Sequence, residues 1–358
     1  MRILQIIDSL DAGGAERMAV NYANALAMEI EFSGLVATRK EGLLLNQIHS
    51  AVSYSFLKKK YKLDLKAIFK LRSYVLKNKV THIHTHSTSF FLALFVKFTV
   101  PSLIIIRHDH YGNNEFLSAR PHLALKLTAF FCAGIIVVNH NLKKWSEQKL
   151  KAKNVVYLPN FVSQDFCTKA YTSLKGMEGK RIIHLANLRP QKNHFLLLEV
   201  AKKLKKSHPE WSFHLVGKDF QDIYSKNIIQ KIKEYSLQQN VFLYGSREDV
   251  PNILKQADIA VLTSESEGLP VALLEYGISK KAVVVTSVGD VPLVVENNSN
   301  GLISDLSVEI FYHLVVELIE KEELRIYLAN RLKETITEKF SPKAVVNQYL
   351  NWLKYIKK

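Results

Sequence analysis

The sequence predicts an α/β fold with two doubly wound domains, each built on a parallel sheet with helices on both faces. Its 358 residues exceed what one hydrophobic core usually organises, and the hydrophobic share of 47% is that of a globular chain. Short runs rich in β-branched residues recur with helical stretches between them, and they lack strict polar alternation, which is typical of parallel strands buried on both faces. In chain order the runs are RILQII, VTHIHTH, SLIIIRH, GIIVVN, NVVYLPN, RIIHLAN, WSFHLVG, VFLYG, ADIAVLT and AVVVTS.

A polar stretch between the fifth and sixth runs predicts the domain boundary. The segment TKAYTSLKGMEGK contains two glycines, and the strand pattern resumes at Arg181. Near the end of the chain, Ser341 and Pro342 suit the first turn of a helix, and spaced apolar residues follow them. The predicted parts are an N-terminal Rossmann-like domain at 1–168, a linker at 169–180, a C-terminal Rossmann-like domain at 181–340 and a helix at 341–358 that packs across the domains.

Composition limits the partners and the compartment. The formal net charge of +16 requires a polyanionic partner, such as nucleic acid, an anionic lipid surface or a polyphosphate substrate. Cys132 and Cys167 are too few for a disulfide scaffold or a closed four-ligand zinc site, so a reducing, cytoplasmic compartment is expected. The start, MRILQIIDSL, predicts a strand and lacks the longer apolar core of a signal peptide. The most membrane-like run, FFLALFVKFTV at 90–100, is well short of the roughly 20 residues that span a bilayer and is interpreted as a buried helix.

The stretch SESEGLPVALLEYG places Glu267 on a glycine turn and Glu275 inside an apolar run. The preceding ADIAVLT predicts a buried strand, Gly268 permits a sharp turn, and Pro270 suits the first position of a following helix. Backbone amides of that first turn would point beyond the end of the strand, which favours a phosphate, and both carboxylates can accept hydrogen bonds from hydroxyls. The stretch therefore predicts a site for a phosphorylated sugar.

Two further turns lie at predicted strand ends. Gly13 and Gly14 would let backbone amides approach a phosphate or a sugar, although a plain glycine turn before a helix explains them equally well. Arg189 and Lys192 flank Pro190, where a forked donor and a point cation suit a leaving diphosphate. Two solvated surface cations are the alternative, and the position at a strand end favours the diphosphate.

Histidines are concentrated in two of the predicted strands. His82, His84 and His86 alternate in THIHTH and would share one face of a strand. A zinc site is disfavoured, because no Cys, Asp or Glu pattern nearby completes a ligand set, and satisfied core or cleft histidines are expected instead. His108 follows an apolar strand directly, where it can contact a reacting sugar or act as an acid or base, although a structural histidine explains it equally well.

In their order along the chain, these segments resemble the retaining glycosyltransferases of the GT4 family, which have the two-domain GT-B fold. The resemblance covers nearly the whole chain and is carried by GGAER, HTH, RHD, NLRPQKNHFLLL, SHPEWSFHLVG, VFLYGSREDVPNILKQADIAVLTSESEGLPVALLE and VGDVPLVVENNSNGLI. Its most specific element is E-x7-E, formed by Glu267 and Glu275. The resemblance implies an N-terminal domain on the acceptor side and a C-terminal domain that binds the nucleotide sugar, facing each other across a cleft.

Candidate site residues follow from the resemblance position by position. Glu275 resembles the glutamate that binds the ribose hydroxyls of the nucleotide, and Glu267 resembles the one that contacts the transferred sugar. Lys192 resembles the phosphate-binding lysine of the family. Gly14 belongs to the loop that faces the diphosphate, and His108 resembles the active-site histidine near the sugar.

The turn between the two glutamates and one departure from the family pattern complete these expectations. Amides of Gly268, of Leu269 and of the neighbours of Pro270 would hold the sugar and the diphosphate, while Pro270 itself has no N–H to donate. Asn187 stands in ANL where many members have the arginine of a G-R-L sequence. Arg189 would supply that charge from a shifted position.

These features predict transfer of a glycosyl unit from a UDP- or GDP-sugar to a hydroxyl of a glycan or lipid-linked acceptor, in bacterial surface polysaccharide synthesis by analogy. No D-x-D sequence is present to hold a metal on the diphosphate, so no metal cofactor is expected. An NAD-dependent oxidoreductase is an alternative, but its G-x-G-x-x-G fingerprint is absent. A noncatalytic sugar-nucleotide binder is another, and the lack of zinc-finger or aromatic RNA-binding motifs disfavours nucleic acid.

The stretch KKKYKLDLKAIFKLRSYVLKNK at 58–79 is strongly basic. It holds nine Lys or Arg residues against Asp64 alone, while Leu65, Ile68 and Leu71 can bury one side of a helix. The pattern indicates either a solvated helix face or a surface that rests on an anionic membrane from the cytoplasmic side.

Overall fold

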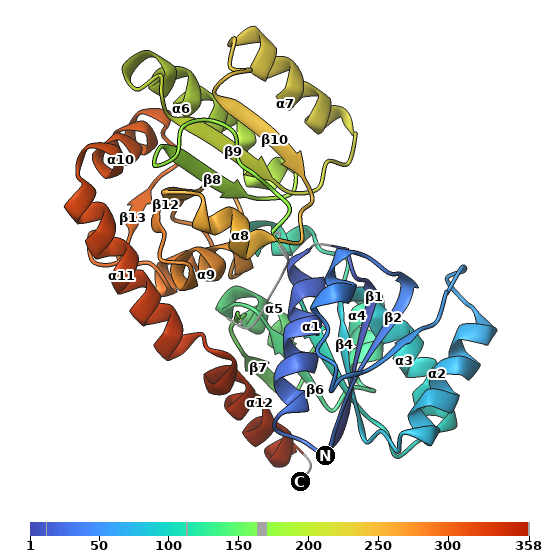
Figure 1. The fold of residues 1–358 in the computed structure, drawn as a ribbon. Helices are drawn as coiled ribbons and strands as arrows, with labels where there is room; N and C mark the ends of the chain where they lie inside the picture. Colours follow the sequence, from blue (N-terminus) through green and yellow to red (C-terminus); the bar gives the residue numbers. More distant parts are fainter. Residues whose placement is uncertain (12, 112–113, 163–169, 357–358) are drawn as a thin grey trace. The chain divides into compact units, whose positions relative to one another are not determined.

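The computed structural model describes residues 1–11, 13–111, 114–162 and 170–356, and the chain forms two compact units. The first unit comprises Met1–Ser163 and Ser341–Lys358, and the second comprises Gln164–Phe340. Each unit has its own parallel sheet (Figure 1). The predicted boundary between residues 168 and 169 lies outside the described residues.

The sheet of the first unit is parallel throughout and has the order β3-β2-β1-β4-β5-β6-β7. Its strands are β1 (Arg2–Ser9), β2 (Phe32–Lys40), β3 (Ser53–Phe56), β4 (His82–His86), β5 (Ile104–Asp109), β6 (Gly134–Val137) and β7 (Val155–Tyr157). The chain first builds outward from β1 and then returns to place β4 on the other side of β1. The strand order therefore reverses between β1 and β4, which is where ligands of doubly wound sheets bind.

Helices cover both faces of this sheet. They are α1 (Gly14–Ala27), α2 (Leu65–Lys77), α3 (Phe90–Thr99), α4 (Leu123–Ala129), α5 (His140–Lys149) and α12 (Pro342–Ile356), with short 3-10 helices η1 (Leu43–Gln47), η2 (Ser87–Ser89) and η3 (Asn114–Ala119). Ile83 packs into the cluster formed with α2 and α3. Its neighbour His84 points to the opposite face, where its ring meets Tyr22 of α1 and Tyr349 of α12.

The helix predicted at 341–358 is thus α12, and its packing lies in the first unit. Its Tyr349 ring lies 5.3 Å from that of Tyr22, and Trp352 fills the space where a side chain at Gly134 would stand. Tyr349 is fully buried by these contacts.

The interpretation of 90–100 as a buried helix is wrong for half of its surface. α3 buries Leu92, Ala93 and Val96 but leaves Phe91, Phe95 and Phe98 exposed. The sequence does not show which side of this helix is exposed, because both the buried and the exposed side are apolar. Among the described residues, no helix is both long enough and apolar enough to span a bilayer.

The six-stranded sheet of the second unit repeats the order of the first six strands of the seven-stranded sheet, β10-β9-β8-β11-β12-β13, with all strands parallel. Its strands are β8 (Arg181–Leu185), β9 (Ser212–Val216), β10 (Val241–Gly245), β11 (Ile259–Leu262), β12 (Ala282–Thr286) and β13 (Leu302–Ser304). Its helices are η4 (Pro190–Lys192), α6 (His194–Ser207), α7 (Ile223–Glu234), α8 (Val250–Lys255), α9 (Val271–Ile278), η5 (Val291–Leu293), α10 (Val308–Glu320) and α11 (Glu322–Lys339). Here the strand order reverses between β8 and β11.

The described part of the predicted linker, from residue 170, is bonded to the second unit. The backbone N–H groups of Tyr171 and Thr172 donate to Oδ2 of Asp249 at 2.9 and 2.7 Å, and Leu174 N donates to Gln256 Oε1 at 2.9 Å. These bonds fix the chain against α8 before β8 begins.

The ten apolar runs coincide with ten strands, and the predicted pair of doubly wound parallel sheets is confirmed. The pattern does not indicate β2, β3 or β13. In β2 the small residues Ser33, Gly34, Ala37 and Thr38 interrupt the apolar run, although the strand is buried. β3 alternates serines with aromatic residues in SYSF, and β13 has only two apolar residues in LIS.

Candidate active site

The loop after β8 is held against the loop after β11 by two hydrogen bonds. Thr263 Oγ1 donates to the carbonyl of Lys192 at 2.9 Å, and Glu265 N donates to the carbonyl of Gln191 at 2.9 Å. Asn193 adopts a left-handed conformation with φ of 48°, and its side chain caps the start of α6. The chain therefore turns sharply directly after Lys192, and the lysine side chain is fixed at the carboxyl end of the sheet.

Lys192 and Glu267 form an ion pair at this edge. Lys192 Nζ lies 2.5 Å from Glu267 Oε1, and Ser264 Oγ donates to the same oxygen at 2.7 Å. The Glu267 side chain is 8% exposed and that of Lys192 is 22% exposed. A lysine ammonium has three N–H donors, and Glu267 occupies one of them. The pair therefore joins a largely buried carboxylate to a cation that water, or a ligand, can still reach.

The loop after β12 supports the backbone of Glu267. Gly289 has a φ of +54°, and a Cβ there would overlap the carbonyl oxygen of Glu267. The N–H of Asp290 donates to the carbonyl of Gly268 at 3.0 Å. Only glycine satisfies both the left-handed conformation and the close approach, so Gly289 fixes how the Glu267 turn lies.

The helix predicted after this turn is α9, which begins one residue later than expected. Pro270 is its N-cap, with φ of −69° and ψ of 123°, and Val271 is its first helical residue. The first-turn amides of a helix lack partners within the helix and carry its positive end, so this turn suits an anion. Gly268, Leu269 and Pro270 are all buried directly ahead of it.

Glu275 is half-buried on α9, and its neighbours hold that helix in place. The buried Tyr276 hydroxyl donates to the carbonyl of Val261 at 3.3 Å and accepts from Leu185 N at 2.6 Å. Burial raises the pKa of Tyr276 well above its usual range, with a smaller contribution from the two nearby glutamates. One tyrosine thus ties α9 to both β8 and β11, and this positions Glu275 relative to the Lys192 loop.

Arg189 lies differently from Lys192, although only three residues separate them. Arg189 is exposed, and its guanidinium carbon stands 4.3 Å from the centre of the Phe220 ring. Asn187, at the position of the family arginine, accepts a hydrogen bond from Lys218 N at 2.7 Å. Lys192 is therefore the cation that meets Glu267, while Arg189 is stacked on an aromatic side chain.

The remaining predicted site residues belong to the first unit. Gly13 is the N-cap of α1 and Gly14 its first residue. Nothing lies within 4 Å of the place where a Cβ of Gly14 would stand, so a ligand can approach the backbone there. His108 is the penultimate residue of β5 and is fully buried.

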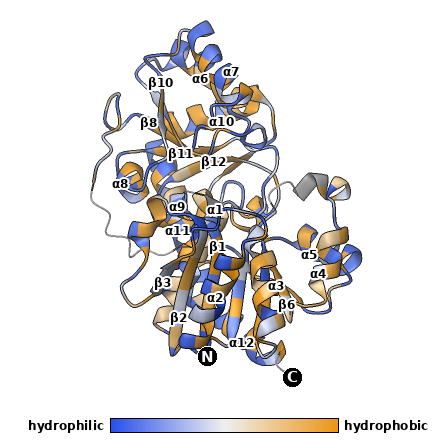
Figure 2. Cartoon of the chain, turned by 90° about the vertical axis from the view of Figure 1, so that its right-hand side faces the viewer, coloured by the Kyte–Doolittle hydropathy of each residue, from blue (hydrophilic) through white to orange (hydrophobic). Residues whose placement is uncertain are grey.

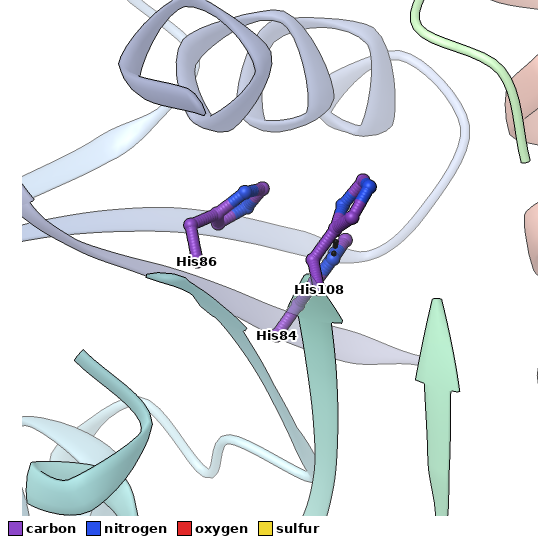
Figure 3. A group of neighbouring side chains, drawn as sticks. All are labelled: His84, His86 and His108. Atoms are coloured by element: carbon purple, nitrogen blue, oxygen red, sulfur yellow. Dashed lines mark hydrogen bonds between the residues drawn. The ribbon is translucent and has the colours of Figure 1, made fainter. Parts of the chain in front are cut away.

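His108 is one of four histidines in contact, which we call the histidine cluster: His84, His86, His108 and His110. His84 Nε2 and His108 Nδ1 are 3.1 Å apart, and His86 Nδ1 and His110 Nε2 are 2.9 Å apart. His86 Nε2 also bonds Gln5 Oε1 at 2.9 Å. Figure 3 shows the rings of the first three on the same side of β4 and β5.

The histidine cluster is electrically neutral at physiological pH. Burial lowers the pKa of His84, His86 and His108 well below the usual value, and it lowers that of His110 to about 4. His84 Nδ1 and His108 Nε2 have no hydrogen-bond partner among the described atoms. The expectation of satisfied histidines in THIHTH is therefore wrong for His84 Nδ1.

The same three histidines offer nitrogen ligands to a metal. One ring nitrogen from each of His84, His86 and His108 lies within 4.8 Å of the others, because the register pairs His86 with His108 on the next strand. The sequence alone does not reveal this ligand set, because His108 lies on a different strand from His84 and His86. Imidazole nitrogens suit Zn²⁺ or Cu²⁺, whereas the Mg²⁺ that commonly accompanies diphosphates prefers oxygen ligands.

Comparisons with known proteins agree with this architecture. Residues 168–335 match the family model described as glycosyl transferases group 1, and residues 12–166 match that of glycosyltransferase family 4. The Anabaena protein HepE, solved in complex with UDP and glucose, has a TM-score of 0.75 at 16% identity, with 99% of this chain and 100% of that chain covered. This likeness concerns the fold.

Two bacterial relatives are similar in sequence. A poly(ribitol-phosphate) alpha-N-acetylglucosaminyltransferase of Staphylococcus aureus is 26% identical over 61% of this chain and 43% of its own length. A UDP-Gal:alpha-D-GlcNAc-diphosphoundecaprenol alpha-1,3-galactosyltransferase of Escherichia coli is 24% identical over 75% of this chain and 73% of its own. The match thus spans less than half of the first relative. With both halves of the chain matched to glycosyltransferase families and two sheets of the expected topology, the chain belongs to the GT4-type glycosyltransferases with the GT-B fold.

Proposed function

We propose that this glycosyltransferase moves a sugar from a nucleotide diphosphate sugar to a hydroxyl of a glycan or lipid-linked acceptor, with retention of configuration and without a divalent metal. The observation that carries the proposal is the Lys192–Glu267 pair, which lies ahead of the first turn of α9. A cation, the positive end of a helix and a carboxylate together match a diphosphate joined to a hydroxyl-rich sugar.

Each part of the donor has a counterpart in the second unit. Lys192 has N–H donors left for phosphate oxygens beside Glu267. The amides at the start of α9 face the same anion. Glu275 accepts hydrogen bonds from ribose hydroxyls, and Glu267 accepts them from the transferred sugar. Arg189 serves the nucleotide phosphates only if it leaves Phe220.

In the reaction, the bond between the anomeric carbon and the diphosphate oxygen breaks, and a bond to the acceptor oxygen forms. The acceptor hydroxyl loses its proton, and the nucleoside diphosphate leaves with the bonding electrons. Lys192 and the amides stabilise the negative charge that develops on the leaving group, a task for which one aimed donor contributes about 3 kcal/mol. No metal is required for this step.

The first unit contributes neutral polar groups in this proposal. His108 contacts the sugar, and Gly14 admits the diphosphate close to the backbone, whereas the Glu16 carboxylate fills the space beside Gly13. Because burial lowers the pKa of His108, it acts as an uncharged hydrogen-bonding group and not as an imidazolium acid.

The names of the two relatives indicate which donor and acceptor substrates to test first. The E. coli relative is named for transfer from UDP-Gal to a sugar on a lipid diphosphate, and the S. aureus relative for transfer to poly(ribitol-phosphate). Both names describe components of bacterial surface polymers. We therefore infer a UDP-sugar as the first donor to test, a role in surface polysaccharide synthesis, and a place on the cytoplasmic side of the membrane.

Two glutamate variants and a matched control test the donor roles. Glu275→Ala should weaken UDP or GDP binding about 10- to 150-fold, the equivalent of roughly 1.5 to 3 kcal/mol for a charged hydrogen bond. Glu267→Gln should lower turnover more than nucleotide binding. Glu265→Gln, at an exposed position two residues before Glu267, should change neither. Calorimetric titration gives the affinities, and NMR of the product gives its anomeric configuration.

The outcomes separate the alternatives. Unchanged nucleotide affinity in Glu275→Ala would reject its ribose role. Equal loss of binding and turnover in Glu267→Gln would show that the two roles have been confused. An inverted product would exclude retention.

A further inference from the structure

The first unit has a second set of apolar side chains that no part of its core covers. Of the thirteen large hydrophobic residues that are exposed in its described part, eleven lie on or beside α2, α3 and α4, and the other two are Met28 and Tyr355. They are Tyr61, Leu63, Leu65, Phe69, Leu76, Phe91, Phe95, Phe98, Leu123, Leu127 and Phe130. In the second unit the exposed hydrophobic residues are spread from Tyr171 to Tyr327. We call the set on α2, α3 and α4 the apolar face.

The three helices repeat one pattern. α3 exposes Phe91, Phe95 and Phe98, and the α4 segment exposes Leu123, Leu127 and Phe130, in both cases at positions i, i+4 and i+7. At about 100° per residue, these positions form one stripe along a helix. The exposed fractions of Phe98 and Phe130 are 58% and 88%, so these rings stand free of the unit's own core.

On α2 the stripe lies beside a row of lysines. Leu65, Phe69 and Leu76 are exposed at i, i+4 and i+11, and Lys66, Lys70 and Lys77 follow each of them by one residue. The lysine row is therefore rotated by about 100° from the apolar stripe. The other side of α2 packs into the core through Ala67, Ile68, Leu71 and Val75. This helix thus has one buried apolar side and one exposed apolar side bordered by cations.

The three stripes lie on the same face of the sheet. α2 packs against α3 (Figure 2). The ring of Phe98 at the end of α3 lies 5.4 Å from that of Phe131, just after α4. The opposite face of the sheet is the one covered by α1 and α12. The apolar face therefore belongs to three helices that cover one face of the sheet.

The sequence around the apolar face is nearly free of acidic residues. Between Lys58 and His108 the only one is Asp64, and 117–146 contains none. The carboxylate of Asp64 is occupied by capping α2, where it accepts from Ala67 N at 3.1 Å and from Lys60 N at 2.9 Å. A surface with exposed Phe and Leu, bordered by lysines and with Asp64 as its one carboxylate between residues 58 and 108, complements an anionic phospholipid bilayer.

We propose that the apolar face binds an anionic phospholipid bilayer, with the lysines of α2 at the headgroups and the aromatic stripe of α3 inserted below them. The contact extends beyond the basic stretch 58–79 to α3 and α4. It goes beyond glycosyl transfer, because it assigns a surface far from the donor residues in sequence. A lipid-linked acceptor would be presented to the first unit from this bilayer.

Three sets of variants test the proposal on the full chain. One carries Lys62, Lys66, Lys70 and Lys77 changed to Gln, and a second carries Phe91, Phe95 and Phe98 changed to Gln. The control carries Lys206, Lys226, Lys233 and Lys255 changed to Gln, which removes the same charge from exposed positions of the second unit. Thermal unfolding and circular dichroism confirm that each variant is folded. Binding is measured by flotation with vesicles of phosphatidylcholine alone or with phosphatidylglycerol.

Wild type should bind the phosphatidylglycerol vesicles and not the neutral ones, less strongly at high salt. The α2 lysine variant should lose about tenfold or more of that binding at low salt. The phenylalanine variant should lose binding at both salt concentrations, and the control should stay within about twofold of wild type. Equal loss in the control would reduce the effect to net charge and overturn the proposal.

Two further results would also overturn it. If wild type shows no preference for anionic vesicles, the apolar face is not a membrane surface. If the phenylalanine variant converts a dimer of wild type to a monomer in size-exclusion chromatography, a second copy covers the face instead. Because vesicle binding is measured without donor or acceptor, its failure would leave the proposed transfer reaction intact.

Discussion

The carboxyl ends of the two parallel sheets carry opposite kinds of polar chemistry, although six strands follow the same order in both. In the first unit, His84, His86 and His108 are buried, uncharged and in contact ring to ring. In the second unit, Lys192 and Glu267 form a charged pair at the corresponding edge. The shared topology fixes where a ligand binds, and the side chains at the strand ends decide what kind of ligand it is.

The difference follows from how each edge is built. The histidines stand on β4 and β5 themselves, so the sheet and its helices bury them and keep them neutral. Lys192 and Glu267 stand on loops beyond the strands, where water still reaches the ammonium. An edge of the first kind suits hydroxyl groups, and one of the second kind suits a diphosphate.

Removing the cation should have the largest effect. Lys192→Ala should lower turnover about 100-fold or more, because a preorganised charge is lost where the diphosphate leaves. Lys205→Ala is the matched control, since Lys205 lies on α6 and donates to Ser236 O at 2.7 Å. Steady-state kinetics with a UDP-sugar measure both. Normal turnover in Lys192→Ala would mean that the pair with Glu267 is structural only.

A second way to break the charged edge is through its backbone. Gly289→Ala should destabilise the protein by about 2 to 4 kcal/mol and reduce turnover, because the new methyl overlaps the carbonyl of Glu267 at a left-handed position. Gly179→Ala is the control: it has a φ of +80° but nothing within 4 Å. It should cost only about 1 to 2 kcal/mol. Chemical denaturation measures the loss of unfolding free energy in each variant. Equal losses in the two variants would show that the overlap with the Glu267 carbonyl adds nothing to the conformational cost.

Acid should destabilise the protein through the neutral histidines of the first unit. The pKa of His110 is lowered to about 4 in the folded chain, whereas an unfolded histidine titrates near 6.5. The unfolded state therefore binds more protons between these values, so the free energy of unfolding should fall as the pH falls from about 6.5 to about 4. His110 keeps some exposure, and we expect it to contribute about 1 to 3 kcal/mol.

The variant His110→Gln isolates this contribution. Denaturant unfolding at several pH values should show a dependence weaker by about one proton than in wild type. An identical slope in the two proteins would mean that His110 titrates normally in the folded state.

The smallest expected effect is that of chelation. Transfer should stay within about twofold of its rate when EDTA is added, because Lys192 and helix amides stabilise the leaving charge in our proposal. Loss of activity that Mg²⁺ or Mn²⁺ restores would place a metal on the diphosphate. Loss that only Zn²⁺ restores would instead point to the nitrogen ligands of the histidine cluster.

Much of the fold is visible in the sequence because buried parallel strands are continuous apolar runs. The turn that carries Glu267 and the helix that carries Glu275 are also predicted, since Gly268 and Pro270 mark the turn. β2 escapes the pattern because small residues such as Ser33 and Gly34 hide a buried strand. The exposed side of α3 escapes it because apolar residues cover both sides of the helix.

The candidate site is harder to derive because its members meet across long stretches of chain. Lys192 and Glu267 are 75 residues apart, and local spacing cannot show that they form a pair. Gly289 is an ordinary glycine in the sequence until β12 brings it against the carbonyl of Glu267. His110 follows a strand end and reads as a loop residue, yet it bonds His86 on the neighbouring strand.

Because α12 packs on the first unit, the two units complete their folding in a defined order during synthesis. Residues Gln164–Phe340 form the second unit from one uninterrupted segment, so it can fold as soon as that segment leaves the ribosome. The first unit has to wait, because Tyr22 and Gly134 meet their partners Tyr349 and Trp352 only when α12 has been made. The unit that is translated first therefore finishes folding last, and until then the part of it that α12 covers, including Tyr22 and Gly134, is exposed to chaperones and to other nascent chains.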